Sequence, residues 1–105
     1  MMNWKEQHFM DGHGNPAGGN SSGCGFNIKW QKGPLMVDGE RKEPNGTFVE
    51  TLLEVVKGRL VFYQGSKFAC NENERAIASI DTALAYMHTR TANREARNVE
   101  GTHAI

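Results

Sequence analysis

Several features by which a function is usually recognised are scarce in this 105-residue chain. Basic and acidic residues balance, so the formal net charge is zero and any site for an anion must be local. The two cysteines, Cys24 and Cys70, match neither a disulfide framework nor a zinc ribbon. These shortages argue against an RNA- or DNA-binding module and predict reduced thiols in a cytosol.

Long apolar segments are missing too. The stretch from Trp4 to His8 is too polar for a signal peptide, and no stretch approaches the roughly 18 apolar residues of a membrane helix. The apolar fraction of 38% is low for a single domain that must form a self-sufficient core. We therefore expect a soluble protein that stays in the cell that makes it and that oligomerises.

Catalytic and metal-binding patterns are equally scarce. The three aspartates form no acidic pair, and no Ser-His-Asp or Cys-His set stands out. No phosphate-binding glycine loop precedes a predicted helix. His8, His13 and Cys24 match no compact zinc spacing. The sequence therefore predicts that the protein is not an enzyme and has no metal or cofactor.

The first 25 residues predict little packed structure. Residues 1–10 carry Trp4 and Phe9 among polar residues, which indicates an edge strand or an arm lying on a partner. Residues 11–25 hold six glycines together with Asn, Ser and Pro, a composition typical of a loop or linker. We assign residues 1–25 to an N-terminal arm and Gly-rich loop.

A strand pattern begins at Phe26, where apolar and polar residues alternate up to Gly33-Pro34. Leu35-Met36-Val37 is long enough for a second short strand, and Asp38-Gly39 is a turn signal. The sequence therefore predicts a small antiparallel β-hairpin or sheet within residues 26–42.

Two helices follow. Thr47-x-x-Glu50 is a capping box in front of an apolar run, so a helix of about 16 residues is expected from Phe48. After a break at Gln64–Lys67, Asn71-x-x-Glu74 predicts a capped second helix of about 26 residues. The fold class is therefore α+β, with a β-hairpin or sheet before a long antiparallel helical hairpin that oligomerises through its helices.

The packing face of the second predicted helix changes character along its length. Its apolar residues recur every three or four positions, and the same spacing continues to Arg94, with Arg90 beside it. One interpretation is an anion site on the overhang beyond the shorter helix. The other is that these cations only complement the helix dipole, worth about 0.3–1 kcal/mol each. Spacing alone favours the second interpretation.

The residues after this helix are polar. Asn98 stands where a left-handed residue commonly ends a helix. Thr102 and His103 follow closely enough to fold back over whatever the arginines hold. The alternative, favoured without further information, is that residues 99–105 fray as most termini do.

These motifs together resemble one family. The most specific is the Arg90–His103 tail, Arg-Thr-x-x-Arg-Glu-x-Arg-x-Val-Glu-Gly-Thr-His, and the others are Gly33-Pro34-Leu35, Pro44-Asn45-Gly46, Phe68-Ala69-Cys70-x-Glu72-Asn73 and Ala83-Leu84. The pattern over residues 26–105 resembles the helical-hairpin domain of phage anti-Thoeris and anti-CBASS signal sponges. The strand-bearing N-terminal part favours the anti-Thoeris branch.

The resemblance implies a function and a set of site residues. Members sequester cyclic nucleotide immune signals without cleaving them, with cyclic ADP-ribose isomers as anti-Thoeris ligands and cyclic di- and trinucleotides as further candidates. Residues 26–105 would be the ligand-binding domain. The implied ligand-binding residues are Arg90, Arg94, Asn73, Tyr63, Thr102 and His103.

The resemblance also implies the protein's surroundings. It would act in the cytoplasm of the infected bacterial host as a dimer or a trimer of dimers, with no DNA, RNA or membrane partner. One departure is Asn98, where the family pattern has glycine, although Asn is the best substitute in that conformation. The alternative function is an oligomeric structural or assembly phage protein whose arginines make interface ion pairs.

Overall fold

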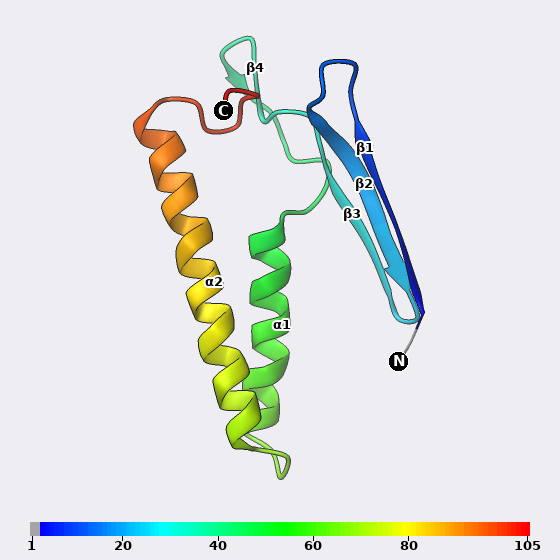
Figure 1. Cartoon of the computed structure of the whole chain (residues 1–105), viewed down its shortest axis with the longest axis vertical. Coiled ribbons are helices and arrows are strands. Elements are labelled where there is room, and N and C mark those ends of the chain that lie inside the picture. The colour runs from blue at the N-terminus through cyan, green and yellow to red at the C-terminus, as the bar shows by residue number, and fades with distance from the viewer. Residues whose placement is uncertain (1–2) are drawn as a thin grey trace. The chain divides into compact units, whose positions relative to one another are not determined.

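The computed structural model describes residues 3–105 and has the α+β fold that the sequence predicts (Figure 1). It divides into two compact units, of which one is the helical hairpin Val49–Asn98 and the other joins the chain up to Phe48 to Val99–Ile105. The elements in chain order are β1 (Trp4–Met10), β2 (Pro16–Gly23), β3 (Phe26–Lys32), β4 (Met36–Val37), β5 (Glu40–Arg41), α1 (Val49–Gln64) and α2 (Asn71–Ala96).

The Gly-rich segment is the centre of a three-stranded antiparallel sheet with strand order β1-β2-β3. The predicted loop over residues 11–25 is therefore wrong for β2. A Cβ at Gly19 would collide with the carbonyl oxygen of Gln7, and a Cβ at Gly23 would collide with the ring of Phe26. Small residues are needed here because the neighbouring strands and their large side chains lie against β2. The expectation of an edge strand in residues 1–10 is confirmed by β1.

Residues 26–42 form the predicted strands, but with different partners. β3 pairs with β2, whereas β4 and β5 form a separate hairpin. Asp38 and Gly39 both have positive φ, 51° and 79°, as a tight two-residue hairpin turn requires. Thr47 lies beside β3, where its N–H donates to the Lys29 carbonyl at 2.8 Å.

The C-terminal tail is folded against β4 and is not frayed. The backbone N–H of Met36 donates to the carbonyl of Gly101 at 2.8 Å. A Cβ at Gly101 would lie 3.3 Å from the Cβ of Leu35, which is 7% exposed. The tail thus helps to cover the buried leucine of its unit.

The helical hairpin has the predicted lengths, 16 residues in α1 and 26 in α2. The Gln64 side chain closes the bend, because its amide donates to the Cys70 carbonyl and accepts from the Cys70 N–H, both at 3.0 Å. The expected cap at Asn71 is wrong, since the N-cap residue is Cys70 and it makes no side-chain cap bond. Asn98 has φ 56°, which confirms the predicted left-handed helix end.

Little of this hairpin is buried. Leu84 is 7% exposed, while Val55 and Phe62 on α1 are 62% and 61% exposed, and Tyr86 on α2 is 70% exposed. Among residues 3–105, Leu35 and Leu84 are the buried apolar side chains. Each unit therefore has a small core and leaves apolar surface that another molecule can cover.

Candidate ligand-binding site

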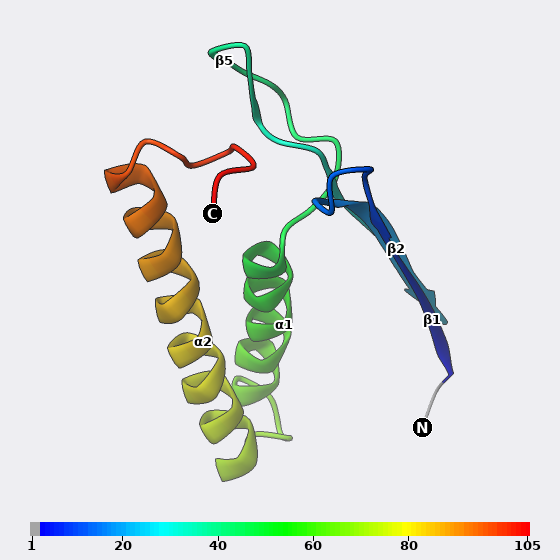
Figure 2. The same cartoon turned by 45° about the horizontal axis from the view of Figure 1, so that its top comes forward.

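The predicted arginine pair lies on the part of α2 that extends beyond α1. Lys57 of α1 contacts Asp81 of α2 at 2.6 Å. The helices are antiparallel, so eight residues back from Lys57 and eight residues on from Asp81 reach the same level. Val49, the first residue of α1, therefore lies opposite Thr89. The last turns of α2 therefore overhang, as Figures 1 and 2 both show.

Within this overhang the arginines differ. Arg94 is half-buried, as a continued packing stripe predicts, whereas Arg90 is exposed. The two are one turn apart, about 6 Å along the axis. Arg97 instead donates from Nε to the Asn93 side-chain oxygen at 3.0 Å. Arg90 and Arg94 are thus spaced to hold one phosphate, or two linked ones, through their planar guanidinium groups.

Tyr63 and Asn73 lie at the other end of the hairpin, beside the bend. The Tyr63 ring is tilted against Phe62 with 6.0 Å between the centroids, and the guanidinium of Arg59 lies 4.9 Å from the Tyr63 ring centre. Asn73 donates from Nδ2 to the Phe68 carbonyl at 3.4 Å. The bend therefore carries an aromatic ring with a cation on one face.

The hairpin does not bring these two pairs of residues together. Arg90 follows Asn73 by seventeen positions of continuous helix, which is ~25 Å at 1.5 Å per residue. One copy of the hairpin therefore offers two separate half-sites, a bend half-site (Tyr63 and Asn73) and an arginine half-site (Arg90 and Arg94).

The last two predicted residues belong to the other unit. Thr102 closes a turn, since its hydroxyl donates to the Val99 carbonyl at 2.5 Å and accepts from the Ala104 N–H at 3.2 Å. His103 is exposed, and its Nδ1 lies 3.2 Å from Nδ2 of Asn15. No sequence pattern predicted this contact, because Asn15 lies in the segment interpreted as a loop.

Asp11 organises the turn that carries Asn15. Its carboxylate accepts from the N–H groups of His13 at 2.8 Å and Asn15 at 3.0 Å. These bonds lower the pKa of Asp11 from its ordinary value of 3.8, and the bond from the Asn15 N–H has the largest effect. Local side-chain bonding of this kind can be recognised in a sequence by an aspartate four residues before an asparagine in a Gly-rich turn.

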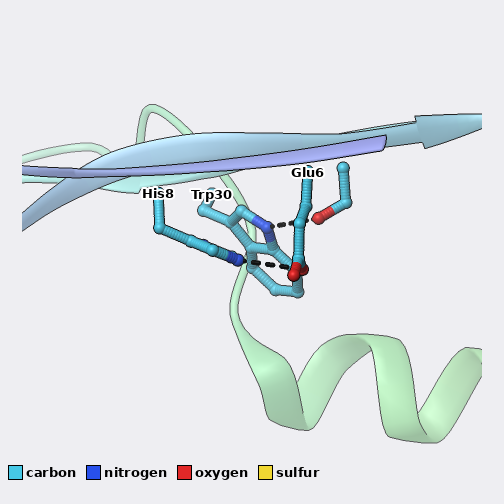
Figure 3. Close-up of polar contacts among 4 residues, drawn as sticks. Glu6, His8 and Trp30 are labelled. Carbon is cyan, nitrogen blue, oxygen red and sulfur yellow. Dashed lines mark hydrogen bonds and ion pairs between the residues drawn. The ribbon is translucent and has the colours of Figure 1, made fainter. Parts of the chain in front are cut away.

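The sheet carries further polar groups that the sequence reasoning did not assign. Figure 3 shows Trp30 beside Glu6 and His8, with the indole N–H donating to Ser21 Oγ at 3.1 Å and His8 Nε2 lying 3.0 Å from Glu6 Oε2. An open groove of about 810 Å³ is lined in part by Phe9, by Trp30 and by Gly18 and Gly19 of the Gly-rich strand.

Two features are absent from residues 3–105. No group of three or more His, Cys, Asp or Glu side chains there is arranged to hold a metal ion. Neither α1 nor α2 is long and apolar enough to cross a membrane.

The molecule is thus an α+β protein whose helical hairpin carries paired arginines beyond its packed region. No family model matches the chain. The chain is 42% identical over 76 residues to the protein named Thoeris anti-defense 1 of Bacillus phage SBSphiJ7. That match covers 72% of this chain and 51% of the relative, so the chain spans about half of the relative's length. This similarity to a phage protein named for Thoeris anti-defence supports the anti-Thoeris branch that the motifs predicted.

Proposed function

We propose that this protein is a phage counter-defence protein that binds and sequesters a cyclic nucleotide immune signal without cleaving it, and so blocks Thoeris, CBASS or both. The observation that carries the proposal is the Arg90–Arg94 pair on the overhang of α2, in a chain related to a protein named for anti-defence. The preferred ligand is a cyclic ADP-ribose isomer, and cyclic di- or trinucleotides are the further candidates.

The arginine half-site supplies the affinity for phosphate. Guanidinium groups are always charged and bind phosphate bidentately, with hydrogen bonds roughly twice as strong as neutral ones. The chain as a whole has no net charge, so this attraction acts locally on a small anion and not on a nucleic acid polymer.

The bend half-site requires a second copy of the chain. A small cyclic nucleotide does not bridge the ~25 Å between Asn73 and Arg90 along one helix. In an antiparallel pair of hairpins, the bend of one copy lies beside the overhang of the other, and Tyr63 then stacks on a base whose phosphates Arg90 and Arg94 hold. The exposed Val55 and Phe62 provide apolar surface for such an assembly. The family resemblance further implies polar contacts to the ligand from Thr102 and His103 of the tail.

The competing function is a structural or assembly protein whose arginines make only ion pairs between copies. The exposed apolar surface of α1 fits either function, because both need an oligomer. Ligand binding separates them, since the structural function gives the arginines no role in holding a nucleotide.

Isothermal titration with cyclic ADP-ribose isomers, cyclic dinucleotides and cyclic trinucleotides tests the proposal. We expect tight binding of at least one ligand, and light scattering should find a dimer or a trimer of dimers. After heat denaturation, chromatography should recover the bound ligand intact. A protein that binds none of these ligands, or that releases a hydrolysed product, contradicts the sponge function, and a monomer at micromolar concentration contradicts the composite site.

A further inference from the structure

The inference concerns the outer edge of β1 and does not depend on the proposed function. Within residues 3–105 the strand order is β1-β2-β3, so β1 pairs with β2 on one side only (Figure 1). The outer edge of β3 is covered, because the Thr47 N–H donates to the Lys29 carbonyl at 2.8 Å and the Thr47 carbonyl accepts from the Gln31 N–H at 3.1 Å. The two edges of the sheet therefore differ, and β1 offers backbone N–H and C=O groups to a further strand.

Two features that often protect an edge strand from pairing are missing from β1. None of its seven residues is proline. The irregular pairing between His8 and Met10 lies in β2, because two steps along β1 there match three steps along β2. All seven side chains of β1 are exposed, and Trp4, Phe9 and Met10 are large and apolar. A regular strand of this kind is a template for pairing with another strand.

A second copy of β1 fits this edge in one register. When a two-fold axis relates two identical antiparallel strands, the residue on the axis lies opposite itself. An axis at Gln7 places Glu6 opposite His8 of the second copy. Glu6 and His8 lie on the same face of the sheet and are already compatible within one chain, where His8 Nε2 lies 3.0 Å from Glu6 Oε2 (Figure 3). Opposite residues have Cβ atoms about 4.5–5.5 Å apart, so the pair can form between the copies too.

The same register gives every exposed apolar side chain of β1 a partner. Trp4 lies opposite Met10 of the second copy, and a thioether packs favourably against an aromatic ring. Lys5 lies opposite Phe9 of the second copy, where an ammonium group is attracted to the ring face. Gln7 lies opposite itself, and two side-chain amides can donate to and accept from each other. Symmetry makes the first two contacts twice.

Neighbouring registers do not match the charges in this way. An axis at Glu6 places two carboxylates opposite each other, and an axis at Lys5 does the same with two ammonium groups. Like charges directly opposite each other destabilise a strand pair. An axis at His8 would place Trp4 opposite residue 12, which lies beyond the end of β1. The charges and the length of the strand therefore select the axis at Gln7.

We propose that β1 is an interface for a second copy of this chain: two copies join their sheets through antiparallel β1 strands, with the two-fold axis at Gln7, into one six-stranded sheet. The main-chain hydrogen bonds supply the attraction, and the facing side chains of Glu6 and His8 set the register. This interface is made by the sheet unit alone. It gives the assembly a contact separate from any that the helices make.

Disulfide trapping tests the position of the axis. The full chain carries Cys24→Ser and Cys70→Ser, which remove the two exposed thiols. With a mild oxidant, Gln7→Cys in this chain should form a disulfide-linked dimer, because opposite residues of antiparallel strands lie within disulfide reach. Asn27→Cys, at an exposed position of β3, measures the rate of random collision. A Gln7→Cys protein that cross-links no faster than Asn27→Cys overturns the proposal.

Two further cysteine variants of the same chain test the register. Lys5→Cys should not cross-link with itself, since the two copies of residue 5 would lie about 14 Å apart along the strands. It should form a disulfide when mixed with Phe9→Cys, because residues 5 and 9 face each other. A Lys5→Cys protein that cross-links with itself as fast as with Phe9→Cys overturns the register.

Charge reversal tests the pairing without cross-links. Glu6→Lys places a lysine opposite His8 of the second copy twice per dimer, which should weaken the self-association measured by sedimentation about tenfold. Adding His8→Glu to Glu6→Lys exchanges the two roles and should restore it. The control Glu40→Lys makes the same charge change at an exposed position of β5 and should associate like the parent. Equal association of Glu6→Lys and Glu40→Lys, or no recovery in the double variant, overturns the proposal. A protein that pairs through β1 but binds no cyclic nucleotide contradicts the proposed function alone.

Discussion

The helical hairpin and the sheet unit reach their structures by different means. The hairpin is built from side-chain periodicity, with Leu84 buried between helices that each continue an apolar stripe. The sheet unit is built from backbone bonds and from residues too small to hinder them, such as Gly19 between β1 and β3. Periodicity is visible in a sequence, whereas the fit of one backbone against another is not. The two units should therefore respond to different substitutions.

The largest expected effect is in the hairpin core. Leu84→Ala removes the buried leucine of α2 and leaves a cavity, which should lower the free energy of unfolding by about 2–5 kcal/mol. The control is Tyr86→Ala, since the tyrosine is 70% exposed on the same helix and its loss should cost much less. Denaturant titration followed by circular dichroism at helical wavelengths measures both. Equal losses of unfolding free energy in the two variants would show that the apolar stripe does not stabilise the hairpin.

A smaller but still large effect is expected in the sheet. Gly19→Ala adds a methyl group that collides with the Gln7 carbonyl, at a φ of 147°, and should cost about 1–3 kcal/mol. Gly12→Ala is the matched control, because a Cβ there meets nothing within 4 Å. Hydrogen exchange of the β1 and β2 amides locates the effect. Protection that falls equally in both variants would contradict the close fit of the strands.

The sequence predicted the hairpin well and the N-terminal unit in part. The lengths of both helices and the left-handed conformation of Asn98 followed from spacing and from end signals. The capping box at Asn71 did not form, because the bend is closed by Gln64 and the helix begins from an extended Cys70. Because Cys70 is the N-cap residue, the Glu74 N–H that the predicted cap would have bonded donates to the Cys70 carbonyl at 3.3 Å instead.

Composition led to a wrong prediction for β2. Glycine and serine are typical of loops, yet here they give the outer strands room, and only the neighbours of Gly19 and Gly23 in the fold reveal that need. The candidate site was likewise predicted only in part. The sequence predicted Arg90 and Arg94 on one helix face, but the contact of His103 with Asn15 joins residues 88 positions apart, and no local pattern carries it.

A moderate effect is expected where the hairpin ends. Asn98→Gly should raise the free energy of unfolding by about 0.5–1 kcal/mol, because glycine adopts φ 56° without steric cost. Asn98→Ala should lower it by a similar amount. Thermal melts rank the three proteins. An alanine variant as stable as the glycine variant would mean that the helix end is not left-handed in solution.

The smallest effect concerns the β1–β2 turn at low pH. The folded pKa of Asp11 is lower than its ordinary 3.8, so its contribution to stability is complete above that value and is lost as the pH falls through the folded pKa. Asp11→Asn removes this dependence. Amide exchange in residues 11–15 between pH 5 and pH 2 should therefore become faster in the parent relative to the variant. Parallel profiles would contradict the bonding of Asp11 in the turn.

The most direct test of the central claim is titration of one cyclic ADP-ribose isomer into Arg94→Ala and into Arg75→Ala. Arg75 is two residues from Asn73 on α2, which turns it by about 200° to the opposite side of the helix. If Arg94 holds a phosphate of an enclosed ligand, its loss should cost about 2–5 kcal/mol of binding, at least roughly thirtyfold in affinity. Both variants should melt close to the parent, since Leu84 and the apolar stripe are unchanged. An Arg94→Ala protein that binds the signal as tightly as Arg75→Ala would contradict the proposed site.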